Sequence, residues 1–168
     1  MLGQLARYYN ELPFPEDPDN STLYHYKNAY FSYGDAIVLY SFLRHHRPQK
    51  LIEVGSGFSS AAILDVNRMF LEDSVCLTFI DPFPRRLLDI LSEEDRRRHT
   101  VIRQPVQDAP LDLFRNLGEG DVLFIDSSHV VKIGSDVAFI FFNVLPVLNP
   151  GVIVHFHDVL WPFEYPKE

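Results

Sequence analysis

Apolar residues come in short runs along most of the chain, and these runs alternate with longer amphipathic segments. A short, largely apolar run without strict alternation of apolar and polar positions is typical of a strand buried on both faces of a sheet. The runs predict five strands, at residues 50–54, 75–80, 100–103, 122–125 and 152–157.

Segments with apolar residues at helical spacing separate these strands, and they predict helices at residues 59–71, 85–97, 111–117 and 135–148. A further helix is predicted to follow Ser32-Tyr-Gly-Asp35, which has the pattern of a capping box, and to end before Pro48. Strands that alternate with helices predict an α/β fold with a Rossmann-like, doubly wound, mostly parallel sheet.

Residues 1–31 differ from the rest of the chain because they are polar, aromatic and proline-marked, without clear periodicity. We expect them to form an N-terminal arm or lid. Residues 32–168 would then form one core, which fits the size of a single domain.

The first predicted strand ends in a glycine turn, Glu53-Val-Gly-Ser-Gly-Phe-Ser59. Ligands of doubly wound sheets bind at the carboxyl ends of the strands, so this turn is the first place to look for a site. Gly55 and Gly57 permit a tight turn and a close approach of ligand to backbone. The following helix offers free N–H groups to a negatively polarised ligand group. A plain tight turn has the same composition, so the glycines alone leave both interpretations open.

Asp81 ends the second predicted strand and strengthens the cofactor interpretation. In a βαβ unit its carboxylate lies beside the glycine turn, where it can accept hydrogen bonds from ribose hydroxyls. The alternative is an aspartate that caps the turn before Pro82. Dinucleotide-binding turns usually have a third glycine where Ser60 stands, and Glu53 would repel a pyrophosphate. These two residues favour a cofactor that carries a positive charge.

A third group of polar residues lies at the ends of the fourth and fifth strands and consists of Asp126, His129, His157 and Asp158. We expect this group to serve an active site. For His155 and for Cys76 we expect packing in the core. His45, His46 and His99 are expected to be solvated, and Arg96-Arg-Arg98, which follows three acidic residues, to form a salt-bridged helix face.

Composition excludes several classes of function. The net charge of −8 argues against non-specific binding of nucleic acid, which needs basic patches. No apolar stretch approaches the roughly 18 residues of a membrane span. The N-terminal residues lack the features of a signal peptide, and the single cysteine suits a reducing compartment, so we expect a cytoplasmic protein.

The order of these motifs resembles class I S-adenosylmethionine-dependent methyltransferases. The segments that carry the resemblance are Ile52–Ser60, Phe79-Ile-Asp81, Phe124–His129 and the closing run Leu145–Asp158. The nearest likeness is to the small-molecule O-methyltransferase-like group whose fifth strand ends in His-Asp. The resemblance implies methyl transfer from S-adenosylmethionine to a small-molecule acceptor, with an oxygen as the expected acceptor atom.

The resemblance also implies roles for individual residues. Glu53, Gly55 and Gly57 would hold the methionine end of the cofactor, Asp81 the ribose, and the segment 106–108 would border the adenine. Asp126 or His129 would assist deprotonation of the acceptor. The full cofactor-binding set implied in this way is Glu53, Gly55, Ser56, Gly57, Ser59, Asp81, Gln107 and Asp126.

In metal-dependent relatives, residues at these strand ends hold a divalent cation, and the matching positions here are Asp126, His157 and Asp158. An imidazole in this set departs from the usual oxygen ligands and would favour a transition metal over magnesium.

Two other functions stay open at this point: an NAD-dependent oxidoreductase, and a non-catalytic module that binds a cofactor or a partner. The end of the sequence favours the non-catalytic module. Sheets of the resembled family continue past the fifth strand, whereas residues 161–168 have little strand character. We therefore expect a sheet truncated after its fifth strand and a chain that is a fragment of a longer protein. An open sheet edge would favour pairing with another chain, such as a homo-oligomer.

Overall fold

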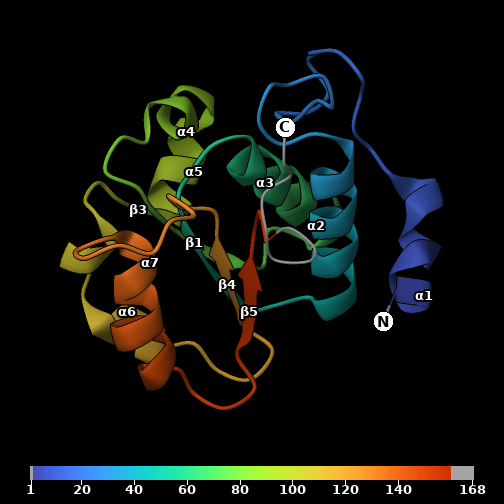
Figure 1. Ribbon diagram of the computed structural model, residues 1–168. Helices are drawn as coiled ribbons and strands as arrows, with labels where there is room; N and C mark the ends of the chain where they lie inside the picture. The colour runs from blue at the N-terminus through green and yellow to red at the C-terminus, as the bar shows by residue number, and fades with distance from the viewer. Residues whose placement is uncertain (1, 160–168) are drawn as a thin grey trace, which may run out of the picture.

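The computed structural model describes residues 2–159 and contains one parallel sheet in the order β3-β2-β1-β4-β5 (Figure 1). Every adjacent pair of strands is parallel, so the predicted doubly wound α/β fold is confirmed. Strands β1 to β3 are added toward one edge of the sheet, and β4 and β5 toward the other. The switch point of the sheet therefore lies between β1 and β4. The strands are β1 (Lys50–Val54), β2 (Cys76–Ile80), β3 (Thr100–Ile102), β4 (Val122–Ile125) and β5 (Ile153–Phe156).

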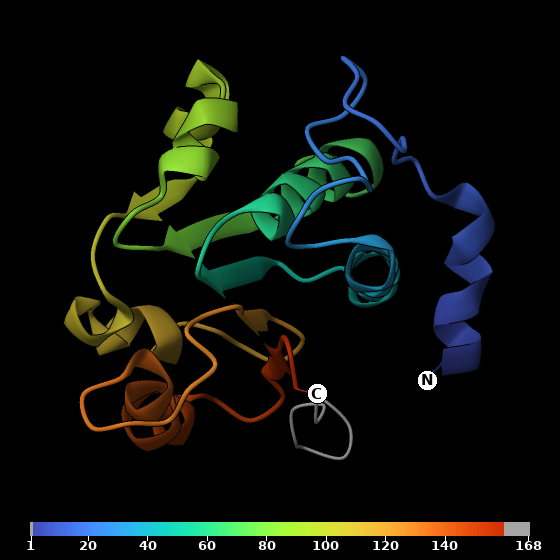
Figure 2. The same ribbon diagram turned by 45° about the horizontal axis from the view of Figure 1, so that its top comes forward.

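Helices cover both faces of the sheet (Figure 2). On one face the sheet side chains share a core with α2 (Tyr33–His46), α3 (Phe58–Phe70) and α4 (Arg85–Ile90). On the other face the core includes side chains of α6 (Leu111–Arg115) and of the π-helical turn η3 (Ile140–Val144). Successive side chains of β1 point to opposite faces of the sheet, so Leu51 lies in the first core and Ile52 in the second.

Two predicted helices are each broken in the structure. The helix expected at 85–97 is two helices, α4 and α5 (Glu93–Arg98), because Ser92 and Asp95 form a capping box that starts a new helix. The helix expected at 135–148 begins as α7 (Asp136–Phe139), continues as η3 and ends in the 3₁₀ turn η4 (Leu145–Val147). Pro146 stands within that last turn, where an α-helix would need its missing N–H group.

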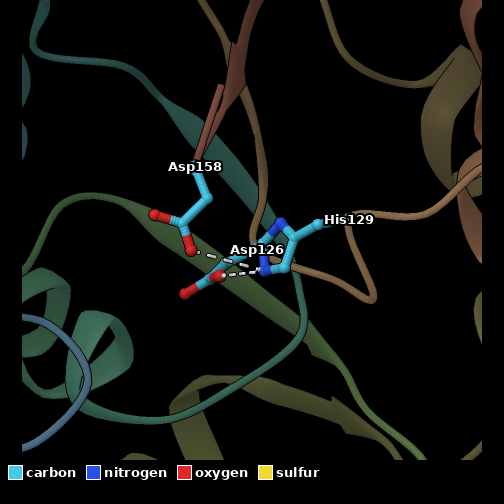
Figure 3. Close-up of side chains that lie close together, drawn as sticks. All are labelled: Asp126, His129 and Asp158. Atoms are coloured by element: carbon cyan, nitrogen blue, oxygen red, sulfur yellow. Dashed lines mark ion pairs between the residues drawn. The ribbon is translucent and has the colours of Figure 1, made fainter. Parts of the chain in front are cut away.

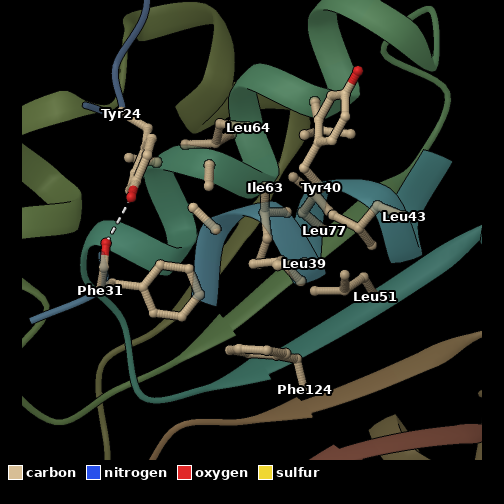
Figure 4. Close-up of a cluster of buried hydrophobic side chains, with 14 of the residues drawn as sticks. Tyr24, Phe31, Leu39, Tyr40, Leu43, Leu51, Ile63, Leu64, Leu77 and Phe124 are labelled. Carbon is tan, nitrogen blue, oxygen red and sulfur yellow. Dashed lines mark hydrogen bonds between the residues drawn. The ribbon is translucent and has the colours of Figure 1, made fainter. Parts of the chain in front are cut away.

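The segment predicted as an arm begins with α1 (Leu2–Leu5) and the 3₁₀ turn η1 (Ala6–Glu11), and from Phe14 onward it contributes to the core. Tyr24 is fully buried and donates its hydroxyl proton to the carbonyl oxygen of Phe31, 2.7 Å away (Figure 4). Asp65 of α3 accepts hydrogen bonds from the N–H groups of Leu23 and Tyr24 at 2.9 and 2.8 Å. This segment is therefore held to α3 by polar and apolar contacts together.

Two predictions on single residues are wrong. Cys76 is exposed, because it is the first residue of β2 and lies at the amino end of the sheet. His99 is buried, and burial lowers its pKa, because it lies between the end of α5 and the start of β3.

The predicted salt-bridged face of α5 is confirmed by ion pairs from Arg96 to Glu93 and from Arg98 to Glu94. Among residues 2–159 the structure contains no helix that is both long and apolar enough to cross a membrane.

The predictions of a truncated sheet and of a fragment rest on residues 161–168, which lie outside the described residues.

Candidate functional site

A pocket of about 510 Å³ lies at the carboxyl ends of β1, β2 and β4. Its walls come from these strand ends, from the 3₁₀ turn η2 (Val106–Asp108) and from the loop between β4 and α7. Of the residues that the sequence implicates in cofactor binding, five line this pocket: Gly55, Ser56, Asp81, Gln107 and Asp126. The other three, Glu53, Gly57 and Ser59, do not line it.

Gly55 sits where the end of β1 comes closest to the end of β4. Its φ of +86° is in the left-handed region, and its N–H group donates to the carbonyl oxygen of Ile80 at 2.9 Å. A Cβ atom added at Gly55 would lie 1.8 Å from the carbonyl oxygen of Asp126. Both the backbone conformation and the space therefore require glycine at this position.

Glu53 is fully buried beneath the first turn of α3. Its carboxyl oxygens accept hydrogen bonds from the hydroxyls of Ser59 at 2.5 Å and Ser60 at 2.6 Å. Ser60 in turn accepts a hydrogen bond from the N–H group of Gly57 at 3.0 Å. Burial raises the pKa of Glu53 to about 8, although the two serine hydroxyls oppose this shift. Ser60, which replaces the third glycine of a dinucleotide-binding turn, thus ties the turn to the strand below it.

Asp81 is held by the turn that it faces. One carboxylate oxygen accepts from the N–H group and the hydroxyl of Ser56 at 2.9 and 2.5 Å, and the other accepts from the N–H group of Phe83 at 2.7 Å. The turn-capping contacts expected from the sequence are thus present. A carboxylate can accept about four hydrogen bonds, so one oxygen of Asp81 keeps capacity for a ligand in the pocket.

Gln107 also lines the pocket, and one of its polar atoms has no partner among the described residues. Its Nε2 donates to the carbonyl oxygen of Gly134 at 3.0 Å, whereas its buried Oε1 has no hydrogen-bond partner among the described residues. A buried acceptor without a donor is costly, so this amide oxygen is suited to accept from a ligand.

Asp126, His129 and Asp158 form a compact polar cluster at the ends of β4 and β5 (Figure 3). His129 Nε2 lies 3.5 Å from Asp126 Oδ1 and 3.6 Å from Asp158 Oδ2. His129 and Asp158 both have positive φ, of 59° and 57°. Asp and His adopt this conformation more readily than most residues, and here both positions direct side chains to the same point.

His157 joins this cluster from the buried side. Its Nδ1 lies 3.3 Å from Asp158 Oδ1 and 3.5 Å from Asp126 Oδ1, and its Nε2 lies 3.4 Å from Asp35 Oδ1. Burial alone would lower the pKa of His157, but the three surrounding carboxylates outweigh it and raise the pKa to about 9. The three carboxylates thus favour the imidazolium form of His157, although its buried Nδ1 makes no hydrogen bond with good geometry among the described residues.

Asp35 is a residue of this cluster that the sequence did not reveal. It was assigned only to the capping box of α2, where its Oδ2 does accept from the N–H group of Ser32 at 3.0 Å. One ligand atom from each of Asp126, His129 and Asp158 lies within 4.8 Å of the others, so His129 is a further potential metal ligand besides the predicted residues. His157, which is one of the predicted ligands, is shared with Asp35. His155 packs against the rings of Phe42 and Phe124.

A second pocket, of about 270 Å³, lies on the other side of the loop between β4 and α7. Residues of this loop alternate between the two pockets: Ser128 and Lys132 line the larger one, and His129 and Val131 line the smaller one. Ser127 lines both. The ion pair between Asp126 and His129 therefore connects one pocket with the other.

Comparison with known proteins gives a consistent set of relatives. A family model described as "Methyltransferase domain" matches residues 52–159. An uncharacterized protein of Archaeoglobus fulgidus is 35% identical over 122 residues, which are 70% of this chain and 54% of that protein. The chain thus spans about half the length of this relative.

Two solved structures share the fold. A structure described as "cmcI-N160 SAH" is similar with a TM-score of 0.58 and 14% identity, over 95% of this chain and 78% of that chain. Another, described as "cmcI-D160 Mg-SAM", is similar with a TM-score of 0.53 and 18% identity, over 88% of this chain and 63% of that chain.

Replacement of Gly55 by alanine should destabilise the protein strongly, because the new Cβ would collide with the backbone of Asp126. Gly120 is a matched control, since its φ is +81° and nothing lies within 4 Å of an added Cβ. Gly120→Ala should lower the free energy of unfolding by about 1–2 kcal/mol, because alanine is strained in the left-handed conformation. Gly55→Ala should cost about 1–3 kcal/mol more, measured by denaturant unfolding. Equal costs at the two positions would contradict the close contact.

Glu53 should make stability depend on pH. Its pKa rises from 4.5 to about 8 on folding, so its contribution is complete below pH 4.5 and is lost as the pH rises through about 8. Glu53→Gln should remove this slope, because the amide is neutral at every pH and can still bond both serine hydroxyls. Unfolding free energies from pH 4.5 to 5.5 test this below pH 6.5, the ordinary pKa at which His157 loses its proton in the unfolded state. The same slope in both proteins would be evidence against a buried, protonated Glu53.

Proposed function

Because this chain belongs to the methyltransferase domain family, we propose that it transfers a methyl group from S-adenosylmethionine to the hydroxyl oxygen of a small molecule. The observation that carries this proposal is the pair of pockets joined by Asp126 and His129. The larger pocket has the volume of a cofactor site, and the smaller one would hold the acceptor.

The walls of the larger pocket suit the parts of S-adenosylmethionine. Asp81 would accept from a ribose hydroxyl, and the unpaired Oε1 of Gln107 would accept from the amino group of adenine. The left-handed turn at Gly55 lets the methionine end approach the backbone. Three residues of the implied set do not line the pocket and would instead hold the glycine turn in place through hydrogen bonds: Glu53, Gly57 and Ser59.

When bound, S-adenosylmethionine supplies an electrophilic methyl group, whose carbon bonds to the acceptor oxygen while the carbon–sulfur bond breaks and leaves its electron pair on sulfur. The residues of this chain would orient the acceptor and take its proton. His129 Nε2 would receive that proton, and the imidazolium so formed faces the carboxylates of Asp126 and Asp158. Proton acceptance by a placed base contributes about 10²–10⁴-fold to a rate.

The same three side chains would also suit a divalent cation. One ligand atom from each of Asp126, His129 and Asp158 lies within 4.8 Å of the others, and a mixed oxygen and nitrogen set favours a transition metal such as Mn²⁺. The two roles exclude each other at His129, because an imidazole nitrogen that coordinates a metal has no lone pair left for a proton.

Calorimetry with S-adenosylhomocysteine and with NAD⁺, side by side, tests the proposed cofactor. We expect S-adenosylhomocysteine to bind and NAD⁺ not to bind. Asp81→Ala should weaken binding roughly 10- to 100-fold, because a hydrogen bond to a charged acceptor is lost.

Two matched variants isolate the effect of Asp81. Asp89→Ala removes an exposed carboxylate of the neighbouring α4 and should leave affinity unchanged. Ser56→Ala removes only the hydroxyl contact to Asp81 and keeps the carboxylate that would accept from the ribose. It therefore shows how much of the effect of Asp81→Ala comes from a loosened turn. Binding of NAD⁺ alone would refute the proposal, and binding of neither ligand would support a non-catalytic module.

Calorimetry with Mn²⁺ distinguishes the two roles of His129. If the cluster is a metal site, Mn²⁺ should bind, and both His129→Ala and Asp158→Ala should abolish binding. If His129 is a base, Mn²⁺ should not bind to the wild-type protein, and His129→Ala should lower kcat about 10²–10⁴-fold. Glu119→Ala, an exchange of an acidic residue remote from the cluster, is the control for both measurements.

A further inference from the structure

We infer that the smaller pocket selects an uncharged acceptor with a single ring and a hydroxyl group, such as a phenol. The inference rests on the proposed function, since it names the class of molecule that would receive the methyl group. It is carried by the size of this pocket, by its aromatic wall and by the charge at its polar end.

The volume of the smaller pocket limits the acceptor. A cavity of about 150 Å³ holds a benzene molecule, whereas pockets for drug-sized ligands begin at about 300 Å³. At about 270 Å³ this pocket accommodates one substituted ring and is too small for a large fused ring system.

The wall of the pocket is apolar and partly aromatic. Phe141 and Phe156 stack with their ring centroids 5.2 Å apart and their planes 22° from parallel, and both line the pocket with Val131 and Val137. Phe141 is 48% exposed, so its ring is not fully used in packing the protein core. A flat apolar ligand would gain contact with these side chains.

The polar end of the pocket disfavours anions. His129, His157 and Asp158 line it, and Asp126 and Asp35 contact the two histidines. Three carboxylates surround two imidazoles, so the group keeps a net negative charge even when both rings are protonated. A carboxylate or phosphate on the acceptor would be repelled there, whereas a neutral hydroxyl can donate to His129 or Asp158.

The position of the polar end also fits transfer. Ser127 lines both pockets, and the 3.5 Å pair of His129 and Asp126 runs from the smaller pocket to the larger one. A hydroxyl that bonds to His129 would therefore be at the side of the pocket that adjoins the proposed cofactor site.

The test measures binding of phenol, benzoate and 1-hydroxypyrene, a phenol with four fused rings, by NMR titration in the presence of saturating S-adenosylhomocysteine. We expect phenol to bind, and benzoate and 1-hydroxypyrene to bind at least about tenfold more weakly. Methyl transfer from S-adenosylmethionine to the same compounds should follow the same order.

Two pairs of variants locate the binding site. Val131→Trp should fill the pocket and abolish phenol binding, whereas Ile133→Trp, on the same exposed loop but outside both pockets, should not. Phe141→Ala should weaken phenol binding about tenfold, whereas Phe142→Ala, which is more exposed and does not line the pocket, should leave it unchanged. All four variants should keep wild-type affinity for S-adenosylhomocysteine, which also shows that they are folded.

The outcomes separate this inference from the proposed function. If S-adenosylhomocysteine binds but phenol does not, or if benzoate or 1-hydroxypyrene binds as well as phenol, the inference is wrong and the proposed function stands. Equal effects of Val131→Trp and Ile133→Trp would also overturn it. If the wild-type protein fails to bind S-adenosylhomocysteine, the proposed function fails and the inference fails with it.

Discussion

The contact between Gly55 and the backbone of Asp126 is the constraint on which the site depends. It sets the distance between the ends of β1 and β4, the two strands on either side of the switch point. The residues proposed to contact the cofactor, Gly55, Asp81 and Gln107, follow β1, β2 and β3, whereas those proposed to act on the acceptor follow β4 or β5. A side chain at position 55 would push the ends of β1 and β4 apart. The ion pair of Asp126 and His129 would then no longer lie between the two pockets.

Much of the fold could be predicted from the sequence because its signals are local. Largely apolar runs located all five strands, and β1 and β4 have the predicted bounds. The break between α4 and α5 was missed although Ser92 and Asp95 are a local signal, because the charged residues around them continue a helical pattern. Cys76 and His99 were misjudged because each lies at an element's end, where the pattern does not determine burial.

The candidate site could be predicted only in part. Parallel topology brings strand ends together, so the group of Asp126, His129, His157 and Asp158 was expected from position alone. Asp35 could not be found in this way, since it comes from the start of α2 and reaches His157 by packing of that helix on the sheet. The same limit applies to Glu53, whose full burial depends on how the first turn of α3 lies above it.

The exposed position of Cys76 has a practical consequence. It is the only cysteine of the sequence, and it begins β2 at the amino end of the sheet, whereas both proposed ligand pockets lie at the carboxyl ends of the strands. A thiol-reactive fluorophore or spin label would therefore attach at one known point without occupying either pocket. Distances from that point to a second label on the loop between β4 and α7 would report whether this loop moves when a ligand binds.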